Sequence, residues 1–128
     1  MNRLTNIVCL LVVAGSASAQ SQPSKPDSDK PQLVEVVGCL AQTGANWTLA
    51  NATEPAASTT SFTTPEAVKA AAEKPLGTGQ IRLLGAAPFS PDAHKGHKMV
   101  VRGLLIKSGS ETRINLTSFQ MVAETCAK

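Results

Sequence analysis

Apolar residues in this chain are grouped in short runs, separated by segments rich in Gly, Pro, Ser and Thr. Five of the runs have the length and the Val, Ile and Leu content of β-strands. They are residues 33–40, 46–50, 80–84, 98–107 and 112–123. Turn residues at 42–45 predict a hairpin between the first two runs, and Ser108-Gly109-Ser110 turns the chain between the last two. The pattern therefore predicts a mainly β protein.

The last run changes parity in its middle. Ile114 and Leu116 share one side of an ideal strand, whereas Phe119 and Met121 share the other. A one-residue β-bulge near Thr117-Ser118 would restore a single inward face, because the extra residue shifts the alternation by one. We therefore predict a bulge at this point and inward side chains on both sides of it.

Two segments between the runs carry helix signals. Thr64-Pro65-Glu66 supplies an N-cap, a proline at the first position and an acid in the first turn. This helix is expected to run to about Lys74, before Pro75, and its mostly alanine face predicts shallow docking. Residues 90–96 predict a single helical turn that Ser90 caps and Gly96 ends.

The order of these elements favours a small closed barrel. Five strands with a helix between the third and the fourth follow the order of the OB-fold. The predicted fold is a mainly β, five-stranded OB-like barrel over residues 33–127. It has one short helix between strands 3 and 4 and a helical insertion between strands 2 and 3. An open α+β sandwich of the same strands is the alternative. A barrel of this size is filled by its own side chains, so no ligand cavity is expected inside it.

The first 32 residues carry signals of export. Residues 1–19 combine one positive charge, an apolar stretch and small residues at positions −3 and −1 before Gln20. This is the pattern of a secretory signal peptide cleaved after Ala19. Residues 20–32 contain three prolines and no hydrophobic residue, which predicts a flexible Pro-rich leader. We expect a periplasmic or secreted protein with no membrane span.

Cleavage changes the cysteine count and the charge. The full chain has 12 Lys+Arg, 9 Asp+Glu and three Cys. Removing 19 of the 128 residues takes away Arg3 and Cys9 and leaves 109 residues, a formal charge of +2 and two cysteines. Cys39 and Cys126 would then be an even pair in an oxidising compartment, which predicts a disulfide.

The chain is poor in aromatic residues, with one Trp, three Phe and no Tyr. Single-stranded nucleic acids are bound by stacking aromatics in a basic groove, so no nucleic-acid partner is expected. Trp47 is the best aromatic anchor for another ligand, with Lys98 and Arg102 as basic neighbours on the strands. That ligand is unknown: a protein, a peptide or an oligosaccharide. The alternative is a core or rim tryptophan and ordinary solvated lysine and arginine side chains. We expect a monomer.

His94-x-x-His97-x-Met99 is the densest cluster of metal-binding residue types. Two imidazoles and a thioether suit copper or zinc. In the alternative interpretation, His94 packs on the short helix, His97 begins a strand and Met99 belongs to the core. Motifs for catalytic nucleophiles, zinc proteases and phosphate loops do not occur in the sequence, so neither an enzyme nor a cofactor is predicted.

Several of these segments together resemble one group of proteins. They are Val36-Val37-Gly38-Cys39-Leu40, Trp47-Thr48-Leu49, residues 94–103 and Ile114-Asn115-Leu116. The pattern is similar to that of small exported bacterial proteins with OB-fold-like domains and unknown function, over most of residues 33–126. Met99 and Leu116 stand where that pattern has Val. The resemblance implies an OB-like barrel and a periplasmic or secreted location, and it supplies no reaction.

The function predicted from the sequence is thus an exported, non-enzymatic binding or interaction module. The alternative is a periplasmic copper- or zinc-binding protein that uses the His94/His97 pair.

Overall fold

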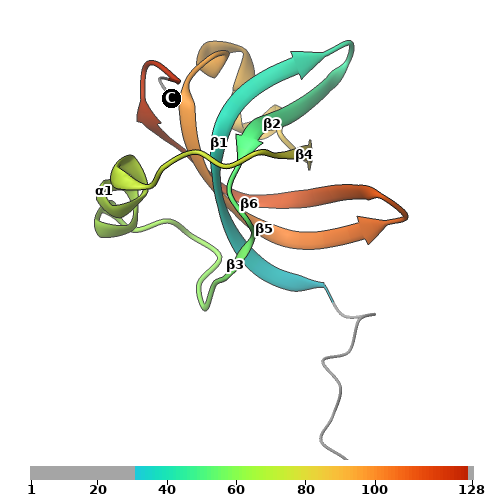
Figure 1. Cartoon of the computed structure of the whole chain (residues 1–128), viewed down its shortest axis with the longest axis horizontal. Helices are drawn as coiled ribbons and strands as arrows, with labels where there is room; N and C mark the ends of the chain where they lie inside the picture. The colour runs from blue at the N-terminus through green and yellow to red at the C-terminus, as the bar shows by residue number, and fades with distance from the viewer. Residues whose placement is uncertain (1–30, 127–128) are drawn as a thin grey trace, which may run out of the picture.

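The computed structural model describes residues 31–126. The predicted signal peptide, most of the predicted leader and the last two residues lie outside the described residues. The described part is mainly β, as predicted (Figure 1). Its elements are β1 (Gln32–Thr43), β2 (Asn46–Ala52), β3 (Ala56–Ala57), α1 (Pro65–Glu73), β4 (Gly79–Leu84), two 3-10 turns (Ala87–Phe89 and Pro91–His94), β5 (Lys98–Ser108) and β6 (Glu111–Ala123).

Five strands form a closed ring of hydrogen-bonded neighbours. Around the ring, β1 pairs with β2, β2 with β4, β4 with β6, β6 with β5, and β5 with β1. The β4–β6 pair is parallel and the other four pairs are antiparallel. β1 curves strongly, so that its first part lies beside β5 and its end lies beside β2 (Figure 1). The two-residue β3 pairs with the beginning of β1.

Aliphatic side chains make up the core. The main cluster of buried residues comprises Val34, Val36, Leu40, Leu49, Ala52, Ile81, Leu83, Ala86, Met99, Val101, Ile114, Leu116 and Phe119. A smaller cluster joins Ala71 of α1 to Val37 and Val100. Val36 and Val37 therefore point to opposite faces of β1, and the helix covers the second face. The only buried residue of α1 is Ala71, in agreement with the predicted shallow docking.

The predicted bulge in β6 is confirmed. Arg102 pairs with Ser118 and Gly103 pairs with Leu116, which leaves Thr117 as the extra residue. Gly103 lies where the strands come closest, because a Cβ atom there would overlap the backbone of Asn115. A second shift in register separates the pairs of Lys98 and Met99, near the end of β6.

One expectation for β6 is wrong. Met121 was expected to face inward with Phe119, but its side chain is 39% exposed. The alternation of a strand is kept only while its register is regular. Met121 pairs with Met99, directly before the second register shift. The end of β6 that begins at Met121 is therefore irregular.

The first predicted helix is confirmed, and the second is confirmed in part, as a short 3-10 turn. Thr64 caps α1 by accepting a hydrogen bond from the Ala67 N–H at 3.2 Å. Residues 87–94 instead form two 3-10 turns, with Ser90 between them in the left-handed region (φ 51°) and without a side-chain cap. The second of these turns begins at Pro91, as predicted, but it ends at His94 and does not reach Gly96.

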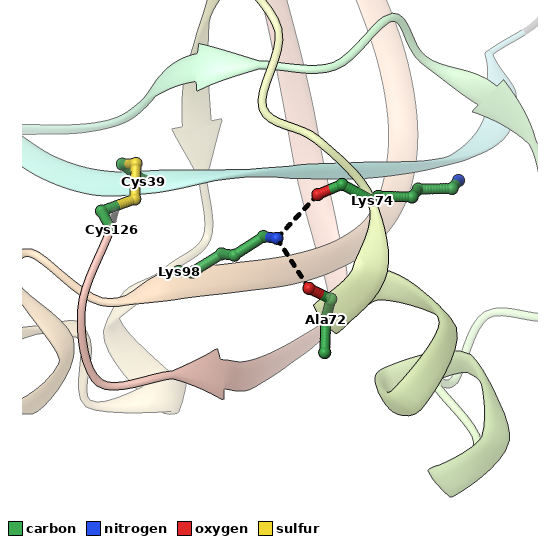
Figure 2. Close-up of a disulfide and its surroundings, with 5 residues drawn as sticks. All are labelled: Cys39, Ala72, Lys74, Lys98 and Cys126. Carbon is green, nitrogen blue, oxygen red and sulfur yellow. Dashed lines mark hydrogen bonds between the residues drawn. A yellow bond between two sulfur atoms is a disulfide. The ribbon is translucent and has the colours of Figure 1, made fainter. Parts of the chain in front are cut away.

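The predicted disulfide is confirmed. It joins Cys39 of β1 to Cys126, beyond the end of β6, across a Cα–Cα distance of 5.8 Å (Figure 2). The bond therefore fixes the last described residue beside the first long strand. No helix within residues 31–126 has the length and apolar character to cross a membrane.

Candidate ligand-binding site

Trp47, the predicted aromatic anchor, is a half-buried residue at the rim of the core. It packs against the main buried cluster and lies opposite Leu83 in the β2–β4 pair. The ammonium of Lys95 lies 5.5 Å from the centre of its ring, within the range of a cation–π interaction. Trp47 therefore offers only part of its surface to a ligand.

Lys98 is turned into the protein. The residue is 8% exposed, and its Nζ donates hydrogen bonds to the carbonyl oxygens of Ala72 at 3.1 Å and Lys74 at 2.7 Å (Figure 2). These carbonyls belong to the end of α1, where the last backbone acceptors lack partners within the helix and the helix dipole is negative. Lys98 thus satisfies the end of the helix.

Arg102 is also committed to contacts within the chain. Its guanidinium pairs with Glu35 (Nη2–Oε2 2.6 Å), and both side chains are less than one fifth exposed. Nη1 donates to the carbonyl oxygen of Phe62 at 2.7 Å and to the hydroxyl of Thr60. The arginine thereby holds the loop around residue 60 against β1 and β5. Trp47, Lys98 and Arg102 have separate sets of partners, and the structure does not bring them into one site.

The two histidines of the predicted metal site do meet. His94 Nδ1 lies 3.3 Å from His97 Nδ1, and the edge of the His94 ring faces Phe119. Met99 is fully buried in the main core cluster and does not join them. Among residues 31–126, no group of three or more His, Cys, Asp and Glu side chains is placed to hold a metal ion.

A different set of side chains surrounds a hollow on the outer face of the ring. We call it the polar hollow. It has a volume of about 340 Å³. Its lining comes from the end of β1, from β2 and β4, and from the β5–β6 turn with the start of β6. The lining residues are Thr43, Asn46, Thr48, Gln80, Arg82, Ser110, Glu111 and Thr112. Thr48 and Arg82 are partners in the β2–β4 pair, so their side chains leave the sheet on the same face.

Charged groups in and beside the polar hollow form a short network. Arg82 donates to Asn46 Oδ1 at 2.8 Å and, at the longer distance of 3.5 Å, to Glu111 Oε1. Arg113 donates to Glu111 Oε2 at 2.7 Å. This hydrogen bond from Arg113 is the main cause that lowers the pKa of Glu111, and the charge of Arg113 and the contacts with Arg82 lower that pKa further. The same pairing raises the pKa of Arg113.

Two other hollows differ from the polar hollow. One of about 360 Å³ lies beside the chain that follows α1 and includes Lys98, whose ammonium is already bonded to the helix end. Another, of about 180 Å³, shares Gln80 and Thr112 with the polar hollow and adds Lys107 and Glu54. The shared residues make the polar hollow and this smaller hollow neighbours on one surface.

The sequence gives only a weak signal for the polar hollow. Polar Asn46 and Thr48 alternate with apolar Trp47 and Leu49 in one strand, and Gln80 and Arg82 alternate with Ile81 and Leu83 in another. Alternation shows that these side chains face away from the core. It does not show that β2 and β4 lie side by side, or that β4 meets β6 in parallel. That information comes from the closed ring.

No protein-family model, curated protein or solved structure matches this chain. The resemblance to small exported bacterial proteins therefore stays a prediction. The geometry of the polar hollow and of the histidine pair is what bears on function.

Proposed function

We propose that this chain is an exported, non-enzymatic binding module built on an OB-like barrel, and that the polar hollow holds its ligand. Counted along the chain, β2 and β4 are the second and third long strands. Residues 43–46 and 108–111 are the turns between strands 1 and 2 and between strands 4 and 5. OB-folds bind ligands on this strand face and with these two loops. The match between that surface and the polar hollow carries the proposal.

The strand pairing also supports the OB-like barrel over the open sandwich. The third long strand meets the fifth in parallel, and the first meets the fourth, so the ring closes without an open edge among the long strands. In this interpretation α1 is an insertion between the second and third barrel strands. The turns at 87–94 take the place of the helix between the third and the fourth.

The chemistry of the lining favours binding over catalysis. Each lining side chain carries a hydroxyl, amide, guanidinium or carboxylate group that can form hydrogen bonds. Glu111 is the carboxylate of the polar hollow, and its hydrogen bond to Arg113 lowers its pKa. A carboxylate stabilised in this way is a poor proton acceptor, because general bases work best when their pKa lies near the working pH.

Export is supported by two features. The Cys39–Cys126 disulfide is of a kind that persists in oxidising compartments such as the periplasm or the extracellular space. The signal-peptide pattern of residues 1–19 and the Pro-rich leader point the same way, although they lie outside the described residues.

A pair of matched variants tests the site. Gln80 lies on the outer face of β4 in the polar hollow. Gln120 is an exposed residue near the end of β6, whereas the polar hollow lies at the start of β6. Gln80→Trp should fill the hollow, whereas Gln120→Trp adds the same side chain elsewhere. Short peptides and oligosaccharides are screened by calorimetry. We expect every ligand found for the natural chain to lose affinity for Gln80→Trp and to keep it for Gln120→Trp. Equal affinity for both variants would contradict the proposal.

We keep metal binding at His94 and His97 as the second candidate, because one distance favours it. Two imidazole nitrogens on one tetrahedral zinc ion are separated by about 3.3 Å, given Zn–N bonds of about 2.0–2.1 Å. The two Nδ1 atoms are 3.3 Å apart. The same distance also fits an N–H of one ring donating to the other ring. Calorimetric titration with zinc and copper should give saturable heat that His94→Ala/His97→Ala removes; absence of saturable heat would exclude this candidate.

A further inference from the structure

The charged groups in and beside the polar hollow do not balance. Arg82 and Arg113 lie opposite each other in the parallel β4–β6 pair, so that both guanidinium groups leave the sheet on the same face. A single carboxylate, that of Glu111, lies between them. Two cations share one anion, and this group carries one net positive charge.

Arg82 is the less neutralised of the two arginines. Glu111 lies 2.7 Å from Arg113 but 3.5 Å from Arg82, whose close partner is the neutral amide oxygen of Asn46. The side chain of Arg82 is about one third exposed, so a ligand can reach it. An arginine presents five N–H donors in a planar fork that fits a carboxylate with two parallel hydrogen bonds. Arg82 can therefore donate hydrogen bonds to a second carboxylate, that of a ligand.

The remainder of the lining narrows the kind of molecule that bears this carboxylate. Hydroxyl and amide side chains surround Arg82, including Thr48, Gln80 and Ser110. Such groups form hydrogen bonds with a polyhydroxylated ligand. The lining contains no aromatic residue on which a nucleobase would stack. It also contains no large aliphatic residue that would make a pocket for an apolar peptide side chain.

The neighbouring smaller hollow suggests that the ligand is longer than one unit. It shares Gln80 and Thr112 with the polar hollow, so the two follow each other along the seam between β4 and the β5–β6 turn. Its own charged residues, Lys107 and Glu54, are of opposite sign and add no net charge. A chain of sugar units laid along this seam would place one acidic group at Arg82 and its hydroxyl groups beside the hydroxyl and amide side chains of the lining.

We infer that the ligand of the polar hollow is an acidic oligosaccharide of the uronic acid type, whose carboxylate is recognised by Arg82. This inference rests on the proposed function, because it names the ligand class of the same site. Its strongest physical support is the pairing of two guanidinium groups with one carboxylate inside a lining of hydroxyl and amide groups.

Two matched ligands and two matched variants test it. The ligands are trigalacturonic acid and its methyl ester, which has nearly the same shape but no charge. The test variant is Arg82→Gln. The control is Lys69→Gln, which also removes one positive charge, but from the exposed surface of α1. Affinities are measured by calorimetry at low and at raised salt concentration, and the site is located by amide chemical shifts.

We expect trigalacturonic acid to bind at least about tenfold more tightly than its ester, the effect of one charge-assisted hydrogen bond. Arg82→Gln should remove that difference, Lys69→Gln should preserve it, and added salt should reduce it. If Arg82→Gln does not fold, Arg82→Lys replaces it; this variant keeps the charge but loses the planar fork, and should weaken binding of the acid by several-fold.

Three outcomes would overturn the inference, and they differ in what they leave standing. Equal binding of acid and ester in the polar hollow would refute the role of charge and leave the proposed function intact. Binding of a peptide there, with no binding of either saccharide, would refute the ligand class alone. Failure of every probe to shift the amides of the polar hollow would refute both.

Discussion

Reduction of the Cys39–Cys126 disulfide should weaken the fold by an amount that follows from its place in the chain. The bond spans a sequence separation of 87 residues, nearly the whole of the described part. It joins β1 to the segment after β6. In the ring, β1 and β6 lie on either side of β5. Without the bond, the unfolded chain gains the conformations that the closed loop had excluded.

The magnitude can be worked from the length of that loop. The chain-entropy relation gives about 4–5 kcal/mol at 25 °C for a loop of about 90 residues. Native disulfides of small exported domains typically contribute about 2–5 kcal/mol when measured. We therefore expect the free energy of unfolding to fall by about 4 kcal/mol on reduction, a large share of the stability of a small domain.

Urea unfolding of the oxidised and the reduced chain measures this difference, with a thiol titration to show that reduction is complete. The midpoint should fall, and the slope of the free energy with urea should rise, because the reduced unfolded chain exposes more surface. Cys39→Ala/Cys126→Ala serves as the control and should resemble the reduced natural chain. A fully reduced chain with an unchanged midpoint and slope would refute the reasoning.

Three further predictions concern single residues. Glu35→Gln should lower the free energy of unfolding by about 3 kcal/mol, because it leaves the guanidinium of Arg102 partly buried without its anion; a loss below about 1 kcal/mol in urea unfolding would contradict that role for the pair. Gly103→Ala should destabilise far more than Gly109→Ala, because a Cβ at 103 overlaps the backbone of β6 whereas at 109 it meets open space and costs about 1 kcal/mol for its positive φ; equal thermal midpoints would be inconsistent with the close approach. The carboxyl of Glu111 should titrate below its ordinary pKa in an NMR pH series, and Arg113→Gln should move that pKa upward. Its contribution to stability is then present above the unfolded pKa and lost as the pH falls through the lowered pKa; an unchanged pKa in Arg113→Gln would show that this hydrogen bond is not the cause.

Local patterns were sufficient to predict most of the elements. The five long strands follow runs of β-branched and aliphatic residues, and the bulge at Thr117 follows from the change of parity between Leu116 and Phe119. The start of α1 follows from Thr64 and Pro65, whose capping chemistry is local. The disulfide follows from cysteine count and compartment. Each of these features depends on neighbouring residues or on a simple count.

Features that depend on distant partners were not predictable in the same way. Lys98 and Arg102 carry no sign in the sequence that one caps a helix end and the other pairs with Glu35. Whether a basic side chain meets solvent or a buried acceptor is decided by elements packed against it, here α1 and the loop around residue 60. The polar hollow likewise needs β4 between β2 and β6, an arrangement that brings together residues 36 and 29 positions away from Arg82.

The 3-10 turns at 87–94 show a limit of capping patterns. Ser90 and Pro91 match the pattern of a helix start, but Ser90 adopts a left-handed conformation between two short turns. The second turn does begin at Pro91, but the Ser90 side chain makes no capping hydrogen bond. The local pattern therefore predicted where the turn begins, but not the left-handed conformation of Ser90 or the lack of a side-chain cap.

The central claim is that ligands occupy the polar hollow, and a map of amide chemical shifts tests it most directly. Trigalacturonic acid and the best peptide and oligosaccharide found by screening are titrated into the isotope-labelled, oxidised chain. We predict that the largest shifts fall on Thr48, Gln80, Arg82 and Thr112, with little change around His94 and Trp47. Saturable binding whose largest shifts lie outside the polar hollow would contradict the account.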